Sequence, residues 1–208
     1  MGASYVNITV KGRNHPEIAA FLRQSDRSAF VTPTTDGISV VYDSKLLAGC
    51  DVVVAATLAG ALASQFRCVT MLAYVFKSDF FVYVLYEAGR EVDRYNSYPN
   101  YPEPVVRVPP IGGDAAKLCR AFGLDVPRRL IPDSPVVIID RILRRYDLPD
   151  EADSYGPVSR GFVYEDDRHR ALLNALHLPE WIANTGYEMF SFAEYPTGFP
   201  AAGMVKVG

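Results

Sequence analysis

The pattern of apolar and polar positions between Val69 and Ser97 predicts three consecutive antiparallel strands. Val69–Phe76 and Phe80–Tyr86 are apolar at neighbouring positions, so both faces of these strands are expected to be buried in the centre of a sheet. Arg90–Tyr95 carries several charged residues. We therefore expect this third strand at an edge or with one face in water, where its charges oppose pairing with other chains.

The residues before this segment predict short strands and two helices. Tyr5–Val10 alternates polar and apolar residues as a strand does, and Asp36-Gly37 predicts a tight hairpin turn between two further strands. His15-Pro16-Glu17 favours the start of a helix, and Asp51 favours the start of another that runs to about Phe66. The expected order is β-α-β-β-α-β plus a hairpin, which matches the ferredoxin-like (split βαβ) arrangement. We predict an α+β fold with helices on one face of an antiparallel sheet.

A change of composition after residue 98 divides the chain. We expect residues 1–98 to form the α+β sheet domain, residues 99–112 a proline-rich linker, and residues 113–208 a mainly helical C-terminal region that packs on the first domain. Within that region, helices are predicted for Ala115–Phe122, Pro135–Tyr146 and a segment from Asp166 or Asp167 to Leu176. Glu151–Gly161 is typical of a polar loop, and Tyr187–Phe192 predicts a last strand or an extended tail.

Composition excludes several classes of protein. A net charge of -3 and a pI of about 5.6 argue against a dedicated nucleic-acid binder. Cys50, Cys68 and Cys119 are far apart and lack metal-binding spacing, so we expect a reducing cytosol, no disulfide framework and no zinc cluster. No apolar run is long enough to span a membrane and no secretory signal is visible, which indicates a soluble cytoplasmic protein without a membrane partner.

The best cluster of polar groups for catalysis is Asp79, Asp93, Asn96 and Ser97, at the ends of adjacent predicted strands. A pair of carboxylates does acid–base work when burial or mutual repulsion raises one pKa. The simpler interpretation is that Asp79 shapes a turn and Asp93 pairs with a neighbouring arginine, Arg90 or Arg94. We favour it, because an antiparallel meander puts the Asp79 turn and the early part of the third strand at opposite ends.

His169 is the histidine with the most acidic surroundings, since Glu165, Asp166 and Asp167 precede it. It could serve as a ligand or a catalytic base. A solvated helix start rich in acidic residues is the favoured interpretation, because carboxylates suit the positive end of a helix. The chain has no HExxH motif, no P-loop and no G-x-S-x-G motif. We therefore expect no cofactor and no metal ion.

Tyr95, Tyr98 and Tyr101 recur at regular spacing beside prolines. Tyrosine offers a large rigid contact area with a polar tip, which protein interfaces favour. The three residues are therefore predicted interaction residues for a protein partner. A loop whose aromatic rings fold back over the sheet is an equal alternative.

The strand segment also carries a recognisable motif, made of an Ser-Asp-Phe turn, Leu-Tyr, a glycine turn and a final Asp-x-Tyr-x-Ser-x-Pro. The matching residues are Ser78, Asp79, Phe80, Tyr83, Leu85, Tyr86, Gly89, Asp93, Tyr95, Ser97 and Pro99, and the resemblance extends to Gly113-Asp114-Ala115 and to Ala175–Pro179. With this motif the chain resembles a family of uncharacterised bacterial proteins, over about half of its length. Lys77 departs from the acidic or neutral residue expected there. The resemblance implies a bacterial cytosolic protein and no particular activity.

Three hypotheses for function follow. The first is a non-catalytic protein-interaction or regulatory module, and it is favoured because no catalytic constellation is visible. The second is a small hydrolase or ligand-binding enzyme with a site between the sheet and the C-terminal helices, which uses Asp79 or Asp93 with His169. The third is a small-ligand sensor, which rests on fold analogy alone. The sequence leaves homo-oligomerisation open.

Overall fold

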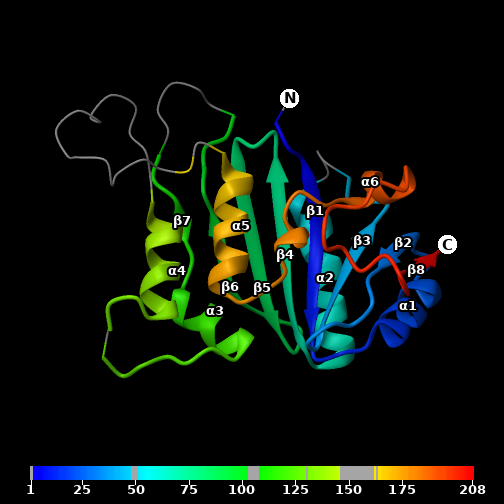
Figure 1. Ribbon diagram of the computed structural model, residues 1–208, viewed down its shortest axis with the longest axis horizontal. Helices are drawn as coiled ribbons and strands as arrows, with labels where there is room; N and C mark the ends of the chain where they lie inside the picture. Colours follow the sequence, from blue (N-terminus) through cyan, green and yellow to red (C-terminus); the bar gives the residue numbers. More distant parts are fainter. Residues whose placement is uncertain (1, 48–50, 103–107, 130, 146–161, 163) are drawn as a thin grey trace.

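An eight-stranded antiparallel sheet organises the molecule in the computed structural model, which describes residues 2–47, 51–102, 108–129, 131–145, 162 and 164–208 (Figure 1). The strand order is β7-β6-β5-β4-β1-β3-β2-β8. This sheet and the helical C-terminal region confirm the predicted α+β class. The elements in chain order are β1 (Tyr5–Lys11), α1 (His15–Gln24), β2 (Ala29–Val31), β3 (Ile38–Asp43), α2 (Val52–Phe66), β4 (Val69–Phe76), β5 (Phe80–Glu87), β6 (Arg90–Asn96), β7 (Ile111–Gly112), α3 (Ala115–Phe122), α4 (Pro135–Arg144), α5 (Glu165–Ala175), the 3-10 helix η1 (Glu180–Ile182), α6 (Tyr187–Ser191) and β8 (Val205–Val207).

Local signals in the sequence set the boundaries of the first elements. The Asn14 side chain accepts a hydrogen bond from the Glu17 backbone N–H at the start of α1, and Asp51 does the same for Val53 at the start of α2. Asp36 and Gly37 both have positive φ, of 51° and 75°, as a tight hairpin between β2 and β3 requires. These three predicted boundaries are confirmed.

The first four strands form the centre of the sheet, and the first two helices pack on it. β4, β1, β3 and β2 are neighbours in that order, and every pairing among them is antiparallel. β5 and β6 then extend the sheet as a meander on the side of β4. The C-terminal strand β8 pairs with β2 and extends the opposite side.

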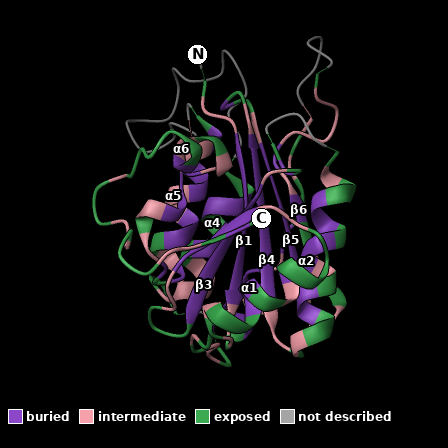
Figure 2. Ribbon diagram, turned by 90° about the vertical axis from the view of Figure 1, so that its right-hand side faces the viewer, coloured by how far each residue is buried: buried purple, intermediate pink, exposed green. Residues whose placement is uncertain are grey.

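Helices cover both faces of the sheet (Figure 2). The helices of residues 1–98, α1 and α2, share one core on one face, as predicted, and the helices of the C-terminal region cover the other face. α1 and α2 form one core with alternate strand residues such as Ile8, Leu72 and Val84. Helices α3 to α6 form a second core with the intervening residues, for example Met71 and Tyr83. A sheet covered on both faces needs apolar residues at successive strand positions, as β4 and β5 have.

The helix α2 lies close to the sheet because its contacting side chains are small. Ala55, Ala59 and Ala63 are fully buried, while Val53 and Val54 of the first turn are exposed. Gly60 allows the close approach to β5, since a Cβ there would lie 3.2 Å from the Tyr86 ring. Small residues on one side of α2 therefore allow its close approach to the sheet.

Three details at the ends of the chain segments differ from the prediction. Tyr187–Phe192 is neither a strand nor an extended tail, because Tyr187–Ser191 forms the helix α6. The last strand is β8, which was not predicted. β6 differs only in part, because β7 pairs with its last residues, Tyr95 and Asn96, whereas its charged residues Arg90, Glu91 and Arg94 are exposed as predicted. These short elements depend on tertiary pairing, which local sequence does not encode.

The predicted linker and C-terminal region are described only in part. Residues 103–107 of the linker and the whole predicted loop Glu151–Gly161 lie outside the described residues. Residues of the C-terminal helices, such as Leu118, Leu143 and Leu173, share one core with the strands. Among the described residues, no helix is long and apolar enough to cross a lipid bilayer.

Candidate functional site

A groove of about 510 Å³ opens on the α2 side of the sheet, where β5 begins and β6 ends; we call it the β5–β6 groove. It lies between the first turn of α2, the two strands, β7 and the turn that follows β6. Its described lining residues are Val52, Phe80, Val82, Arg94, Asn96, Tyr98, Pro99, Tyr101, Ile111 and Gly112. A groove of this size with mainly apolar walls has the properties of a binding site.

Strand pairing places the floor of the groove. Asn96 lies opposite Val82 and Arg94 lies opposite Val84 in the antiparallel ladder between β5 and β6. Directly paired residues point to the same face of a sheet. Asn96 and Arg94 therefore emerge on the α2 side, beside the apolar side chain of Val82.

Two of the three predicted interaction tyrosines form one wall of the groove. The Tyr101 ring packs against Phe80 at 4.7 Å between centroids and meets Tyr98 edge to face at 5.5 Å. The turn is held by Asn96, whose Oδ1 accepts a hydrogen bond of 2.9 Å from the Tyr98 backbone N–H. The wall is thus preorganised by aromatic packing, although both tyrosines remain partly accessible.

Tyr95 does not belong to this surface, which corrects the prediction of three interaction tyrosines. Its side chain is fully buried on the opposite face of the sheet, where it stacks on Tyr83. Its hydroxyl donates a hydrogen bond of 3.0 Å to the backbone carbonyl of Leu143 in α4. Tyr95 anchors a helix to the sheet, because residues of a strand alternate between its faces.

Charge in the groove is locally balanced. Arg94 is the one charged residue among the described lining residues, and it donates two hydrogen bonds, of 3.0 and 2.9 Å, to the Glu91 carboxylate. This pairing lowers the pKa of Glu91. Asp79 lies near the Tyr101 end of the groove, where it accepts a hydrogen bond of 3.4 Å from the Tyr101 hydroxyl. Lys77, which carries the opposite charge, lies two residues before Asp79 in the same turn.

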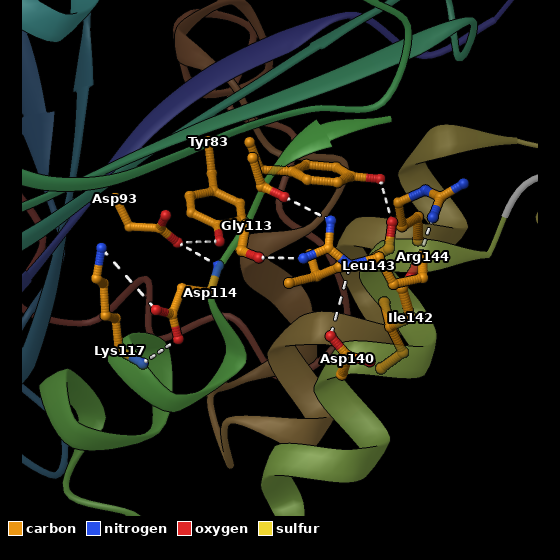
Figure 3. A network of polar contacts seen from close by, with 12 residues as sticks. Tyr83, Asp93, Gly113, Asp114, Lys117, Asp140, Ile142, Leu143 and Arg144 are labelled. Atoms are coloured by element: carbon orange, nitrogen blue, oxygen red, sulfur yellow. Dashed lines mark hydrogen bonds and ion pairs between the residues drawn. The ribbon is translucent and has the colours of Figure 1, made fainter. Parts of the chain in front are cut away.

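Asp93 has a structural role in a polar network on the other face (Figure 3). Its Oδ2 accepts hydrogen bonds from the Tyr83 hydroxyl at 2.5 Å and from the Asp114 backbone N–H at 2.8 Å. Burial and the Asp93 charge raise the pKa of Tyr83. The expectation that Asp93 pairs with Arg90 or Arg94 was therefore wrong, and the carboxylate ties the start of α3 to the sheet.

The other hydrogen bonds of this network stabilise the connection between β7 and α3. Arg144 of α4 donates hydrogen bonds of 2.9 Å to the carbonyls of Gly112 and Gly113, and it lies 3.5 Å from Asp140 (Figure 3). Asp114 caps α3 by accepting a hydrogen bond from the Lys117 backbone N–H. A second groove of about 560 Å³ borders these residues. Its cations already pair with Asp140 or Asp133, so it presents no unbalanced charge.

The two candidate carboxylates do not form a pair. Asp79 sits in the turn before β5, whereas Asp93 pairs across the ladder with Leu85 near the other end of that strand. Leu85 is six residues after Asp79, which is about 20 Å along the strand at 3.4 Å per residue. Among the described residues, no hydrogen bond joins either carboxylate to His169. The proposed acid–base constellation is not assembled.

The His169 side chain is fully buried between α5 and the sheet. The expectation that it lies on a solvated helix start was therefore wrong. Its Nδ1 shares a hydrogen bond of 2.9 Å with the Tyr5 hydroxyl, and its ring stacks between Tyr5 and Phe81. Nε2 has no partner. Desolvation lowers the pKa of His169 to about 3, so the imidazole is neutral.

Helical spacing was the signal that could have located His169. It precedes Leu172, Leu173 and Leu176, which were predicted to be buried, by three, four and seven residues. The neighbouring Arg168 is also buried, with a hydrogen bond of 2.6 Å to Glu165. The acidic residues at the start of α5 favoured a solvated helix, so the helical spacing that places His169 on the buried side was not recognised.

Metal binding finds no support in the described part of the chain, where no group of three or more His, Cys, Asp or Glu side chains is close enough together to hold an ion. Cys68 and Cys119 are free thiols whose pKa is raised by burial, and Cys50 lies outside the described residues. A raised pKa keeps a thiol protonated and unreactive.

Comparison with known proteins adds no relative: no protein-family model, no curated protein and no solved structure matches the chain. The resemblance to uncharacterised bacterial proteins therefore stays a prediction.

Proposed function

We propose that the chain is a non-catalytic protein-interaction module, with a regulatory role in the bacterial cytosol, and that a protein partner docks in the β5–β6 groove. The observation that carries this proposal is an aromatic wall beside apolar residues that are left accessible at the rim. Ile111, which lines the groove, is 57% exposed, and Val53, the residue after the lining residue Val52 in α2, is 63% exposed. Exposed apolar side chains beside ordered aromatic rings are typical of interaction surfaces.

The fold supports this interpretation in one further way. We propose that the first six elements form a ferredoxin-like unit, which is supported by the order β4-β1-β3-β2 and by the position of α1 and α2 in one core. The groove then lies on the added β5–β6 hairpin and the segment after it. Binding sites commonly lie on such additions to a rigid scaffold.

Photocrosslinking tests the proposed docking surface. A photoreactive amino acid at Val53 or at Ile111 should give the same single protein adduct in the native host. The matched control is Phe192, which is 76% exposed but follows α6 on the opposite side of the sheet. No such adduct should form there. With the purified partner, Tyr101→Ala should weaken binding about tenfold or more, because it removes the aromatic wall.

Two outcomes contradict the proposal. In one, the partner crosslinks at Phe192 and not at the groove. In the other, Tyr101→Ala binds the purified partner as tightly as the unchanged protein while its unfolding midpoint shows that it is folded.

A further inference from the structure

The hydrogen-bonding groups of the β5–β6 groove restrict the kind of segment that fits there. We infer that the groove takes a proline-rich segment of the partner in the extended polyproline II conformation. This inference rests on the proposed function, because it names the partner of the same groove. It is drawn from the donors, acceptors, shape and charge of the described lining residues.

The floor of the groove offers hydrogen-bond donors. The Asn96 side chain uses its Oδ1 to hold Tyr98, and its Nδ2 group has no acceptor among the described residues. Arg94 uses Nε and Nη2 for Glu91, which leaves Nη1 without a protein acceptor in the same described set. Both groups can therefore donate to carbonyl groups of an incoming chain.

Three side chains around the groove already accept a hydrogen bond from the protein. Asn96 Oδ1 accepts from Tyr98, the Glu91 carboxylate accepts from Arg94, and Asp79 accepts from Tyr101. An occupant that brings carbonyl acceptors but few N–H donors matches this set. A proline-rich segment has that property, since proline lacks a backbone N–H and the polyproline II helix leaves its carbonyls free.

Shape and charge agree with this occupant. Polyproline II segments dock into grooves lined by aromatic rings, and here the tilted Tyr101 and Phe80 rings and the perpendicular Tyr98 ring supply such walls. The Arg94 charge is compensated by Glu91, so an uncharged segment meets no unpaired ion. An amphipathic helix is a poorer match, because its carbonyls are bonded internally and would leave Asn96 Nδ2 without an acceptor.

The test uses the full chain and a synthetic peptide of repeated Pro-Pro-Ala units, followed by backbone amide shifts in nuclear magnetic resonance. The control peptide has alanine in place of every proline. The proline peptide should shift amides of Phe80–Val82, Arg94–Tyr98 and Ile111, and the alanine peptide should not. High salt should leave the affinity unchanged within about twofold, because no unpaired charge is involved.

Asn96→Asp is the decisive variant. The carboxylate still accepts from the Tyr98 backbone N–H, so the turn keeps its hydrogen bond, but the Nδ2 donor is gone. Affinity for the proline peptide should fall about tenfold, since a peptide carbonyl loses its partner and faces a negative charge. The matched control Asn174→Asp, on the exposed side of α5, should bind as the unchanged protein does.

The outcomes separate this inference from the proposed function. If groove positions crosslink to a partner but the proline peptide shifts no groove amide, the inference is overturned and the proposed function stands. Preferential binding of the alanine peptide, or an unchanged affinity in Asn96→Asp, also overturns it. If the rim positions give no partner adduct, the proposed function itself fails.

Discussion

Acid should destabilise the protein through one buried side chain, His169. Its pKa in the folded protein is about 3, below the unperturbed value of about 6.5 that applies when the chain is unfolded. The unfolded state therefore takes up a proton first as the pH falls. The stability that comes from keeping the imidazole neutral is complete above about pH 6.5 and is lost progressively down to about pH 3.

The size of the effect follows from these two pKa values. Between about pH 7.5 and pH 5 the folded state binds almost no proton at His169, whereas the unfolded state becomes almost fully protonated there. Linkage then gives a loss of about 2 kcal/mol in the free energy of unfolding. This is a large share of the stability of a typical domain, about 5–15 kcal/mol.

Urea unfolding at several pH values measures the loss, with the fluorescence of the one tryptophan, Trp181, as the signal. The matched control is His169→Phe, which keeps an aromatic ring between Tyr5 and Phe81 but cannot take up a proton. Subtracting its pH dependence removes the contribution of carboxylates and of His15 and His177. Equal pH dependences of the two proteins between pH 7.5 and 5 would refute the assigned role of His169.

Three further substitutions test the polar contacts in the core, each by urea unfolding at neutral pH. Arg168→Met should cost about 3–5 kcal/mol, because it removes the buried guanidinium that pairs with Glu165 and donates hydrogen bonds to the carbonyls of Ile142 and Arg145; a cost below 1 kcal/mol would contradict the burial of that pair. Asp93→Asn should cost about 1–3 kcal/mol by weakening two hydrogen bonds, whereas Asp79→Asn in the exposed turn should stay within about 0.5 kcal/mol. Tyr95→Phe should cost about 1 kcal/mol, since the Leu143 carbonyl loses its donor; an unchanged midpoint would argue against that bond.

The strands and helices with strong local signals were predictable from the sequence. β4 and β5 are continuous apolar runs, and α2 has a cap at Asp51 and alanines on one side. A helical C-terminal region packed on the first domain was predicted, but the local pattern of β1, where Asn7 and Thr9 alternate with apolar residues, does not show that this region buries the face that bears them. The structure buries that face, and Asn7 donates hydrogen bonds to the carbonyls of Ile182 and Thr185. A buried polar residue with partners far along the chain has the same local pattern as an exposed one.

The candidate site was predicted in part for a similar reason. Tyr98 and Tyr101 follow the end of β6, where proline and asparagine indicated an exposed turn, and both line the groove. Tyr95 has the same residue type but lies inside the strand, on the face that the C-terminal helices cover. Spacing alone did not separate them, because the end of β6 and the identity of its buried face depend on the C-terminal region.

The pairing of β8 with β2 has a consequence for how the protein reaches its native state during translation. β2 leaves the ribosome early, yet the strand that covers its outer edge is made long afterwards. Until then the nascent chain presents an unpaired β-edge, which is a template for intermolecular aggregation. Chaperone dependence of biosynthesis should therefore increase when Val205–Val207 is disrupted, even though these residues lie far along the sequence from the strand they protect.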